Sequence, residues 1–291
     1  MNETCISNNE TTARTSSTRS SAPAPGDPDW LPTWDGSLYA ANTGHHRAYD
    51  DWFLAHFPVR PSDRVLDIGC GSGDFTGRVA RLVPDGEVVG VDPQASMLEA
   101  ASAVARPNQR FVRARAQELV AALPNHTFDA IFSRATLQWI PLADYPEIFA
   151  AVLALLRPGG WFRLECGAAG NVARVAEVVG EISVRHGGPP PPWTFADPGQ
   201  HLDLLEAAGF AVDEAGGFVR SVAQRRTFTE ETLVGWLRSQ CYLGFDEAMT
   251  PERRAAFRAD VESHLGDLRR ADGSYDQTFV RLDALVYRPD S

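Results

Sequence analysis

The sequence predicts an α/β fold in which a parallel sheet is covered by helices on both faces. Apolar segments near residues 64–68, 87–91, 110–113, 128–132 and 160–165 have the length of buried strands, and segments with helical spacing separate them. A glycine-rich turn follows the first segment, and an acidic residue closes the second. Sheets of this kind bind ligands at the carboxyl ends of their strands, so we expect the functional site there.

The glycine-rich turn connects the first strand to a helix through Gly69, Gly71 and Gly73. Without Cβ atoms, the backbone can approach a flat polar ligand and direct its amides toward it. A dinucleotide-binding fingerprint requires a third glycine where this chain has Asp74. Asp67, at the strand end, would repel phosphates but attract a ligand with ammonium and sulfonium groups. The turn therefore favours S-adenosylmethionine.

The second predicted strand ends in Asp92, which lies 25 residues after Asp67. A carboxylate that binds a ribose belongs at this place in a doubly wound sheet, and we expect Asp92 to accept from both ribose hydroxyls. The alternative, an ordinary loop with Asp92 as a helix-capping acid, explains the joint spacing less well.

Composition indicates a protein that acts on small molecules. With 291 residues and 44% hydrophobic content, the chain can form one catalytic domain and an accessory cap. The net charge of −11 argues against nucleic acid as a partner, and no apolar run approaches the ~20 residues that span a bilayer. All 27 basic residues are arginine, which excludes a lysine Schiff base and a P-loop lysine.

The four cysteines are scattered without metal-ligand spacing, which predicts neither a disulfide framework nor a metal site. A reducing compartment, the cytoplasm, is the expected location. The oligomeric state is left open.

Changes in composition suggest a division of the chain into four parts. Residues 1–29 are polar and are expected to be a disordered tail, whereas residues 30–58 carry an aromatic stripe typical of a helical lid. Residues 59–170 would form the cofactor-binding core, and residues 171–291 a helical cap with the closing strands of the sheet. Within this last part we expect helices at 171–186, 199–208, 229–243 and 251–270, and strands at 210–214 and 279–287.

Several motifs support a more specific resemblance. They are the glycine turn, Asp92, the strand 128–133, the turn 156–160, and the narrower segments 135–141 and 236–240. Over residues 30–288 the chain resembles class I S-adenosylmethionine-dependent methyltransferases, in particular the trans-aconitate methyltransferase-like group. This resemblance implies a Rossmann-like, doubly wound, seven-stranded sheet whose last strand is antiparallel, with a helical cap.

The resemblance also implies roles for individual residues in cofactor binding. The methionine moiety would contact Asp67, Gly69 and Gly71, with Ser133 beside its amino-acid end; Asp92 would bind the ribose and Met97 the adenine face. An acid that usually follows the third strand is missing here. Ala116, through its backbone amide, and Gln117, as a neutral acceptor, are expected to bind the adenine instead.

Methyl transfer requires alignment in a dry pocket, and a general base only where the acceptor must lose a proton. Candidate bases are Glu165, His46 and His45. The alternative for Glu165 is an ion pair with Arg163 or Arg134, and for the histidines a surface or capping position. Aromatic residues could form an apolar wall for the acceptor, and the equally open alternative is that they pack in the core. They are Tyr39, Trp139 and Trp236, with Trp193 and Tyr242.

The favoured function is therefore methylation of a small molecule at an oxygen nucleophile such as a carboxylate, in secondary metabolism. The main alternative is carbon methylation of a prenyl diphosphate or an aromatic intermediate. A non-catalytic cofactor-binding protein and a nicotinamide dehydrogenase complete the alternatives.

Overall fold

The computed structural model describes residues 33–42, 50–55, 57–212, 216–245, 247 and 249–290. The predicted tail of residues 1–29 lies outside them. The described chain forms one seven-stranded sheet of order β3-β2-β1-β4-β5-β7-β6. The strands are β1 (Arg64–Ile68), β2 (Glu87–Asp92), β3 (Gln109–Arg113), β4 (Phe128–Arg134), β5 (Leu156–Gly167), β6 (Phe218–Phe228) and β7 (Tyr275–Tyr287).

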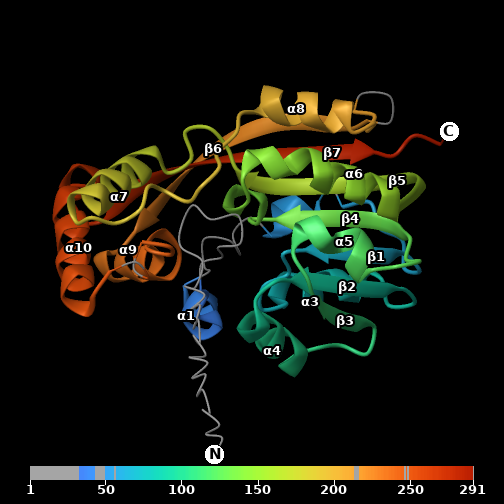
Figure 1. Cartoon of the computed structure of the whole chain (residues 1–291), viewed down its shortest axis with the longest axis horizontal. Coiled ribbons are helices and arrows are strands. Elements are labelled where there is room, and N and C mark those ends of the chain that lie inside the picture. The colour runs from blue at the N-terminus through green and yellow to red at the C-terminus, as the bar shows by residue number, and fades with distance from the viewer. Residues whose placement is uncertain are drawn as a thin grey trace, which may run out of the picture.

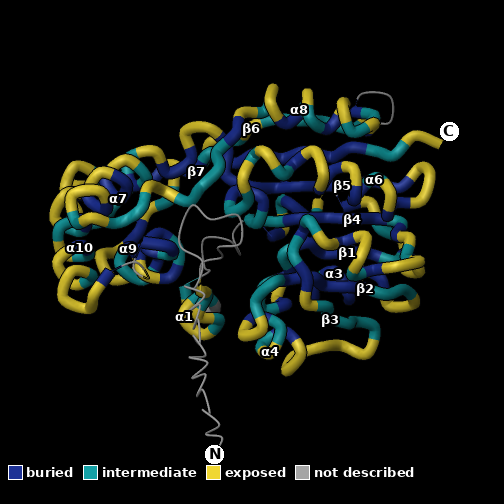
Figure 2. The backbone as a smooth tube through the Cα atoms, viewed as in Figure 1, coloured by how far each residue is buried: buried dark blue, intermediate teal, exposed yellow. Residues whose placement is uncertain are grey.

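The first five strands are parallel, and β7 pairs antiparallel with both β5 and β6. This confirms the predicted seven-stranded sheet, in which the last strand along the chain, β7, is antiparallel. β1 is completely flanked by other strands and is almost wholly buried, because apolar residues point to both of its faces (Figure 2).

Helices cover both faces of the sheet. Residues of α5 (Leu119–Ala122), α6 (Tyr145–Leu155) and α8 (Pro198–Ala207) pack into the apolar core on one face. Residues of α3 (Asp74–Leu82) and of the helical segment 50–54 pack into the core on the other. The helix α4 (Ala95–Ala103) contacts β2 and β3. This doubly covered arrangement leaves the carboxyl ends of the strands available for a site.

A second apolar core lies in a helical lobe made by α7 (Ala173–Arg185), α9 (Glu230–Trp236) and α10 (Pro251–His264). The long strands β6 and β7 run from the sheet into this lobe, where Phe228 and Phe279 join its core (Figure 1). The helix α1 (Gly36–Ala41) lies between the lobe and α4 (Figure 1). Its flanking residues contact both sides, because Ser96 Oγ donates to Trp34 O at 3.3 Å and Gln240 Nε2 donates to Asn42 O at 3.3 Å.

Some elements differ from the sequence-based expectations. β6 was not predicted, because its arginine-rich sequence reads as polar; as an edge strand it exposes every second residue. In place of a strand at 210–214, the described residues make a single bridge between Ala211 and Tyr287. The helix expected over 229–243 consists of α9 and a π-helical turn, Leu237–Cys241, and α10 ends at His264. None of the described helices is long and apolar enough to cross a membrane.

Candidate functional site

The glycine turn opens directly onto a cleft at the carboxyl ends of the strands. Gly69 has a φ of +75°, and a Cβ at this position would collide with the side chain of Thr136, so no larger residue fits. Gly71 has a φ of +53°, and no atom lies within 4 Å in the direction of a Cβ, so this side of the residue is open. At Gly69 both packing and the positive φ exclude a larger residue, whereas at Gly71 the positive φ alone favours glycine.

Asp92 is held at the edge of this cleft by two backbone amides. Its Oδ2 accepts from Gly71 N at 3.0 Å and its Oδ1 from Gln94 N at 2.9 Å. The side chain is only 8% exposed, and burial raises the pKa of this carboxyl. Each oxygen keeps acceptor capacity beyond its backbone partner, which suits a pair of ribose hydroxyls.

Asp67 lies one strand away and is more deeply buried. Its Oδ2 accepts from Thr76 Oγ1 at 2.6 Å, and burial raises the pKa of Asp67 to about 7. A nearby cationic ligand would favour the ionised form. Cys70, within the turn, is also buried, and burial raises the pKa of its thiol, so it is inert at neutral pH.

Two cavities meet above the glycine turn. The first has an empty volume of about 1000 Å³ and follows the ends of β2 and β3, whereas the second lies over β1 and the start of α3. Five residues line both cavities and define the junction: Tyr39, Gly69, Gly71, Arg134 and Ala135. The predicted adenine-side residues line the first cavity: Met97, Ala116 and Gln117.

These residues fit the expected S-adenosylmethionine. In the sheet order β3-β2-β1, the residues expected at the base, the ribose and the amino-acid end follow three successive strands. The Asp92 carboxylate suits the ribose, the apolar Met97 side chain suits the purine, and Asp67 suits a cationic end. Within the described residues, no group of three His, Cys, Asp or Glu side chains gathers to hold a metal ion.

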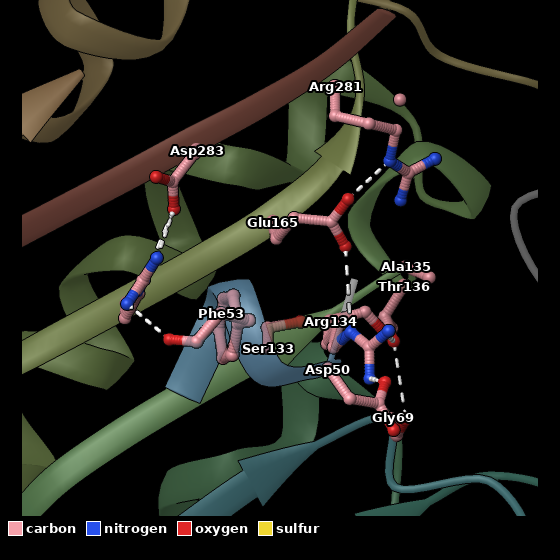
Figure 3. A network of polar contacts seen from close by, with 12 residues as sticks. Asp50, Phe53, Gly69, Ser133, Arg134, Ala135, Thr136, Glu165, Arg281 and Asp283 are labelled. Atoms are coloured by element: carbon pink, nitrogen blue, oxygen red, sulfur yellow. Dashed lines mark hydrogen bonds and ion pairs between the residues drawn. The ribbon is translucent and has the colours of Figure 1, made fainter. Parts of the chain in front are cut away.

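The opposite edge of the cleft, at β4 and β5, carries a buried network of charges (Figure 3). Arg134 Nη1 lies 2.5 Å from Asp50 Oδ1, and Arg134 Nε lies 3.9 Å from Glu165 Oε2. Arg281 Nε donates to the other oxygen of Glu165. Asp50 also accepts from Arg78 Nη1 at 2.6 Å. The network thus connects α3, the helical segment 50–54, β4, β5 and β7.

Glu165, expected as a general base, is only 2% exposed and lies between two guanidinium groups. It does not line either cavity. Of the two partners considered from the sequence, Arg134 lies at ion-pair distance, whereas Arg163 donates to Asp283 Oδ1 and to Phe53 O. Arg281 was missed, because its approach to Glu165 depends on the register between β5 and β7.

Of the remaining predicted site residues that the structure describes, only Trp139 lines a cavity. Trp139 lines the first cavity and lies edge-on to Trp34, with ring centroids 5.0 Å apart. Ser133 is buried and donates to Ile68 O at 3.0 Å, without lining either cavity. Trp236 packs in the helical lobe against Phe279, with ring centroids 5.4 Å apart. His45 and His46 lie outside the described residues.

Comparison with known protein families gives a match over the core of the sheet. Residues 65–160 match the family described as "Methyltransferase domain". The chain is 42% identical to trans-aconitate 2-methyltransferase of Deinococcus radiodurans, over 44% of this chain and 47% of that enzyme, so the aligned region spans about half of that relative. It is 28% identical to trans-aconitate 2-methyltransferase of Methylobacterium radiotolerans, over 83% of this chain and 90% of that enzyme.

Solved structures share the fold at lower identity. The YcgJ protein of Bacillus subtilis superposes with a TM-score of 0.59 at 19% identity, over 84% of this chain and 100% of that one. Phosphoethanolamine N-methyltransferase 2 of Haemonchus contortus, solved with S-adenosyl-L-methionine, gives a TM-score of 0.54 at 19% identity, over 87% of this chain and 56% of that one.

Proposed function

The chain is a class I S-adenosylmethionine-dependent methyltransferase of the trans-aconitate methyltransferase-like group, and on this premise we propose that it methylates a carboxylate oxygen of a small organic acid. The cofactor supplies a sulfonium methyl group that is already electrophilic. The task of the protein is then to align the acceptor oxygen and to exclude water.

The observation that carries this proposal is the chemistry of the junction between the two cavities. Its titratable side chains, among the described residues, are Arg134 and Tyr39. Burial raises the pKa of Tyr39 to about 12, although Arg134 acts in the opposite direction, so the phenol stays protonated at neutral pH. Both groups are hydrogen-bond donors and neither is a base, which suits an acceptor that is already an anion.

The relatives add a second line of support. Enzymes from Methylobacterium radiotolerans and Azoarcus are both named trans-aconitate 2-methyltransferase, and each aligns over most of its length. Their named acceptor is a carboxylic acid. Secondary metabolism, expected from the sequence, stays a prediction.

We assign the acceptor carboxylate to Arg134 and Tyr39, with Trp139 as an apolar wall. In this assignment Glu165 is a positioning residue and not the base expected from the sequence. It holds Arg134 from β5 while Asp50 holds it from the helical segment 50–54, so the guanidinium has a fixed place at the junction. Preorganised donors of this kind lose little entropy when an anion binds.

The test combines a product assay with variants of Arg134. The full chain is incubated with methyl-labelled cofactor and a panel of mono-, di- and tricarboxylic acids, geranyl diphosphate and phenols, and products are identified by mass spectrometry. We expect methyl esters that mild alkali hydrolyses. Arg134→Gln should lower kcat/KM for the acid by about 100-fold, the scale for one preorganised donor. The affinity for S-adenosylhomocysteine should change less than threefold, as measured by calorimetry.

The control for Arg134→Gln is Arg134→Lys, which keeps a cation in the buried network and should retain more activity. An alkali-stable, carbon-methylated product from the isoprenoid or phenol would contradict the proposal. So would a kcat, at saturating cofactor, that rises with an apparent pKa near that of histidine, because a carboxylate acceptor needs no base.

A further inference from the structure

The adenine end of the cleft presents an amide where the resembling enzymes present an acid. β3 is the neighbour of β2, so a base attached to a ribose at Asp92 lies beyond the end of β3. Gln117 lines the cavity there, in the short turn Ala116–Glu118 that follows β3. A glutamine can either donate or accept at this place, and it distinguishes a purine amine from a purine carbonyl only if its amide is held in one orientation.

Asp144 holds that amide. Gln117 Nε2 donates to Asp144 Oδ2 at 2.8 Å, across a separation of 27 residues. An ionised carboxylate only accepts hydrogen bonds, so the nitrogen of the amide must face Asp144 and the carbonyl oxygen must face away from it. This orientation follows from the chemistry of the pair.

Asp144 has no competing role in the helix that it precedes. It is the residue before α6, but its side chain makes no capping hydrogen bond to that helix. The first turn of α6 also contains Glu147, an exposed acid that complements the helix dipole. The carboxylate of Asp144 is therefore committed to Gln117.

We propose that Asp144 is a positioning residue which fixes the carbonyl oxygen of Gln117 as the acceptor for the 6-amino group of the cofactor's purine. The acid that usually follows the third strand is thus supplied by the connection between β4 and α6, and it acts through an intervening amide. This pair selects a 6-aminopurine over a 6-oxopurine. The proposal depends on the cofactor alone, so the identity of the methyl acceptor does not affect its test.

The experiment measures binding of two ligands by calorimetry on the full chain. S-adenosylhomocysteine carries the 6-amino group, and S-inosylhomocysteine carries a carbonyl at the same position. Wild-type protein should bind the first about 10- to 100-fold more tightly, because the carbonyl of Gln117 would otherwise face another acceptor. Asp144→Ala frees the amide to turn, and this ratio should fall by at least about threefold; the discrimination by the backbone amide of Ala116, which faces an acceptor N1 in adenine and an N1–H in the 6-oxopurine, should remain.

A second variant makes the test directional. Asp144→Lys places a donor where the acceptor was, so the amide oxygen turns toward the lysine and the amide nitrogen toward the base. The ratio between the two ligands should then fall further than in Asp144→Ala. Glu147→Ala is the matched control, since it removes an acid from the first turn of the same helix and leaves the contact between Gln117 and Asp144 in place. The ratio of the two ligand affinities in this variant should equal that of the wild type.

The proposal is overturned if Asp144→Ala keeps the wild-type ratio. It is equally overturned if this variant weakens both ligands by the same factor, because that result describes a structural role. Thermal unfolding of each variant shows whether the protein is folded under the conditions of the titration.

Discussion

The two edges of the cleft are built in different ways. At the β1–β2 edge, Asp67, the glycine turn and Asp92 belong to neighbouring strand ends, and much of the surface offered to a ligand is backbone. At the β4–β5 edge, Arg134 is held by Asp50 and Glu165, and Glu165 also binds Arg281, which is 116 residues away along the chain. The first edge is formed by residues at neighbouring strand ends, whereas the second is formed by charged side chains that are far apart in the sequence.

The difference has energetic consequences. Backbone amides that hold Asp92 are fixed by the sheet and the turn, so this edge is stable before any ligand binds. Buried ion pairs instead depend on every member, since removal of one partner leaves another charge without compensation. The β4–β5 edge is therefore the more vulnerable to substitution, and the β1–β2 edge the more closely tied to cofactor affinity.

The largest effect is expected for Glu165→Leu. Arg281, whose side chain is 5% exposed, and Arg134 both lose the Glu165 carboxylate, so the free energy of unfolding should fall by about 3–5 kcal/mol. Urea denaturation measures this change. Glu206→Leu, on an exposed position of α8, should change the same quantity by less than about 0.5 kcal/mol. A loss under about 1 kcal/mol for Glu165→Leu would show that the network is dispensable and would erase the contrast between the edges.

A smaller effect is expected at the other edge for Asp92→Ala. Loss of a charged acceptor should weaken binding of S-adenosylhomocysteine by about 1.5–3 kcal/mol, with little change in the free energy of unfolding. Calorimetric titration measures the dissociation constant, and Asp85→Ala, in the exposed loop before β2, is the control. An unchanged dissociation constant would remove Asp92 from the ribose site.

The pH dependence of Asp67 sharpens the comparison further. Burial raises the pKa of this carboxyl to about 7 in the folded protein, above its unfolded value, so the folded state binds the proton more tightly. Stability without ligand should therefore be greatest at acidic pH and decline as pH rises through the window up to about 7, by at most about 1.4 kcal/mol per pH unit.

The affinity for the cofactor should rise with pH as Asp67 ionises, whereas the stability of the ligand-free protein should fall. The ionised carboxylate attracts the ammonium group of S-adenosylhomocysteine, so affinity should increase by up to about tenfold between about pH 6 and about pH 8. Asp67→Asn should flatten both profiles while it still accepts from Thr76. Retention of the pH dependence in this variant would assign it to another group.

The smallest effects are expected for conservative substitutions of Trp236 and Trp139, which should change different quantities. Trp236→Phe should lower the free energy of unfolding by about 1 kcal/mol and leave the KM of the acceptor within about twofold, because the side chain packs in the lobe. Trp139→Phe, at the cleft, should raise that KM instead. Steady-state kinetics on the same acid measure the KM of both variants. A raised KM in Trp236→Phe would show that the helical lobe contributes to the acceptor site.

The residues of the local edge could be located from the sequence because their signals are local. β1, β2 and the glycine turn form a continuous stretch in which strand ends, acids and turn residues are adjacent, so spacing alone locates Asp67 and Asp92. Met97 and Gln117 could be placed only through the resemblance. The contact from Gln117 to Asp144 had no signal in the spacing.

The assembled edge could not be predicted because it depends on strand register. Glu165 was recognised as a residue at a strand end, but its pairing with Arg281 follows from the antiparallel register of β5 and β7, in which Gly167 lies opposite Arg281. β6 escaped prediction for a related reason. Arg220, Arg225 and Arg226 interrupt its apolar character, and its strand conformation is evident from its antiparallel pairing with β7.

The placement of β7 between β5 and β6 has a consequence for how the chain can be shortened. β5 pairs with β7 from Trp161 to Gly167, so a fragment that stops before residue 171 would leave a row of amides and carbonyls open beside Phe162 and Leu164. Exposed apolar edges recruit other copies and aggregate. We therefore expect the region that matches the methyltransferase family to need β7, which comes near the far end of the chain, to cover this edge.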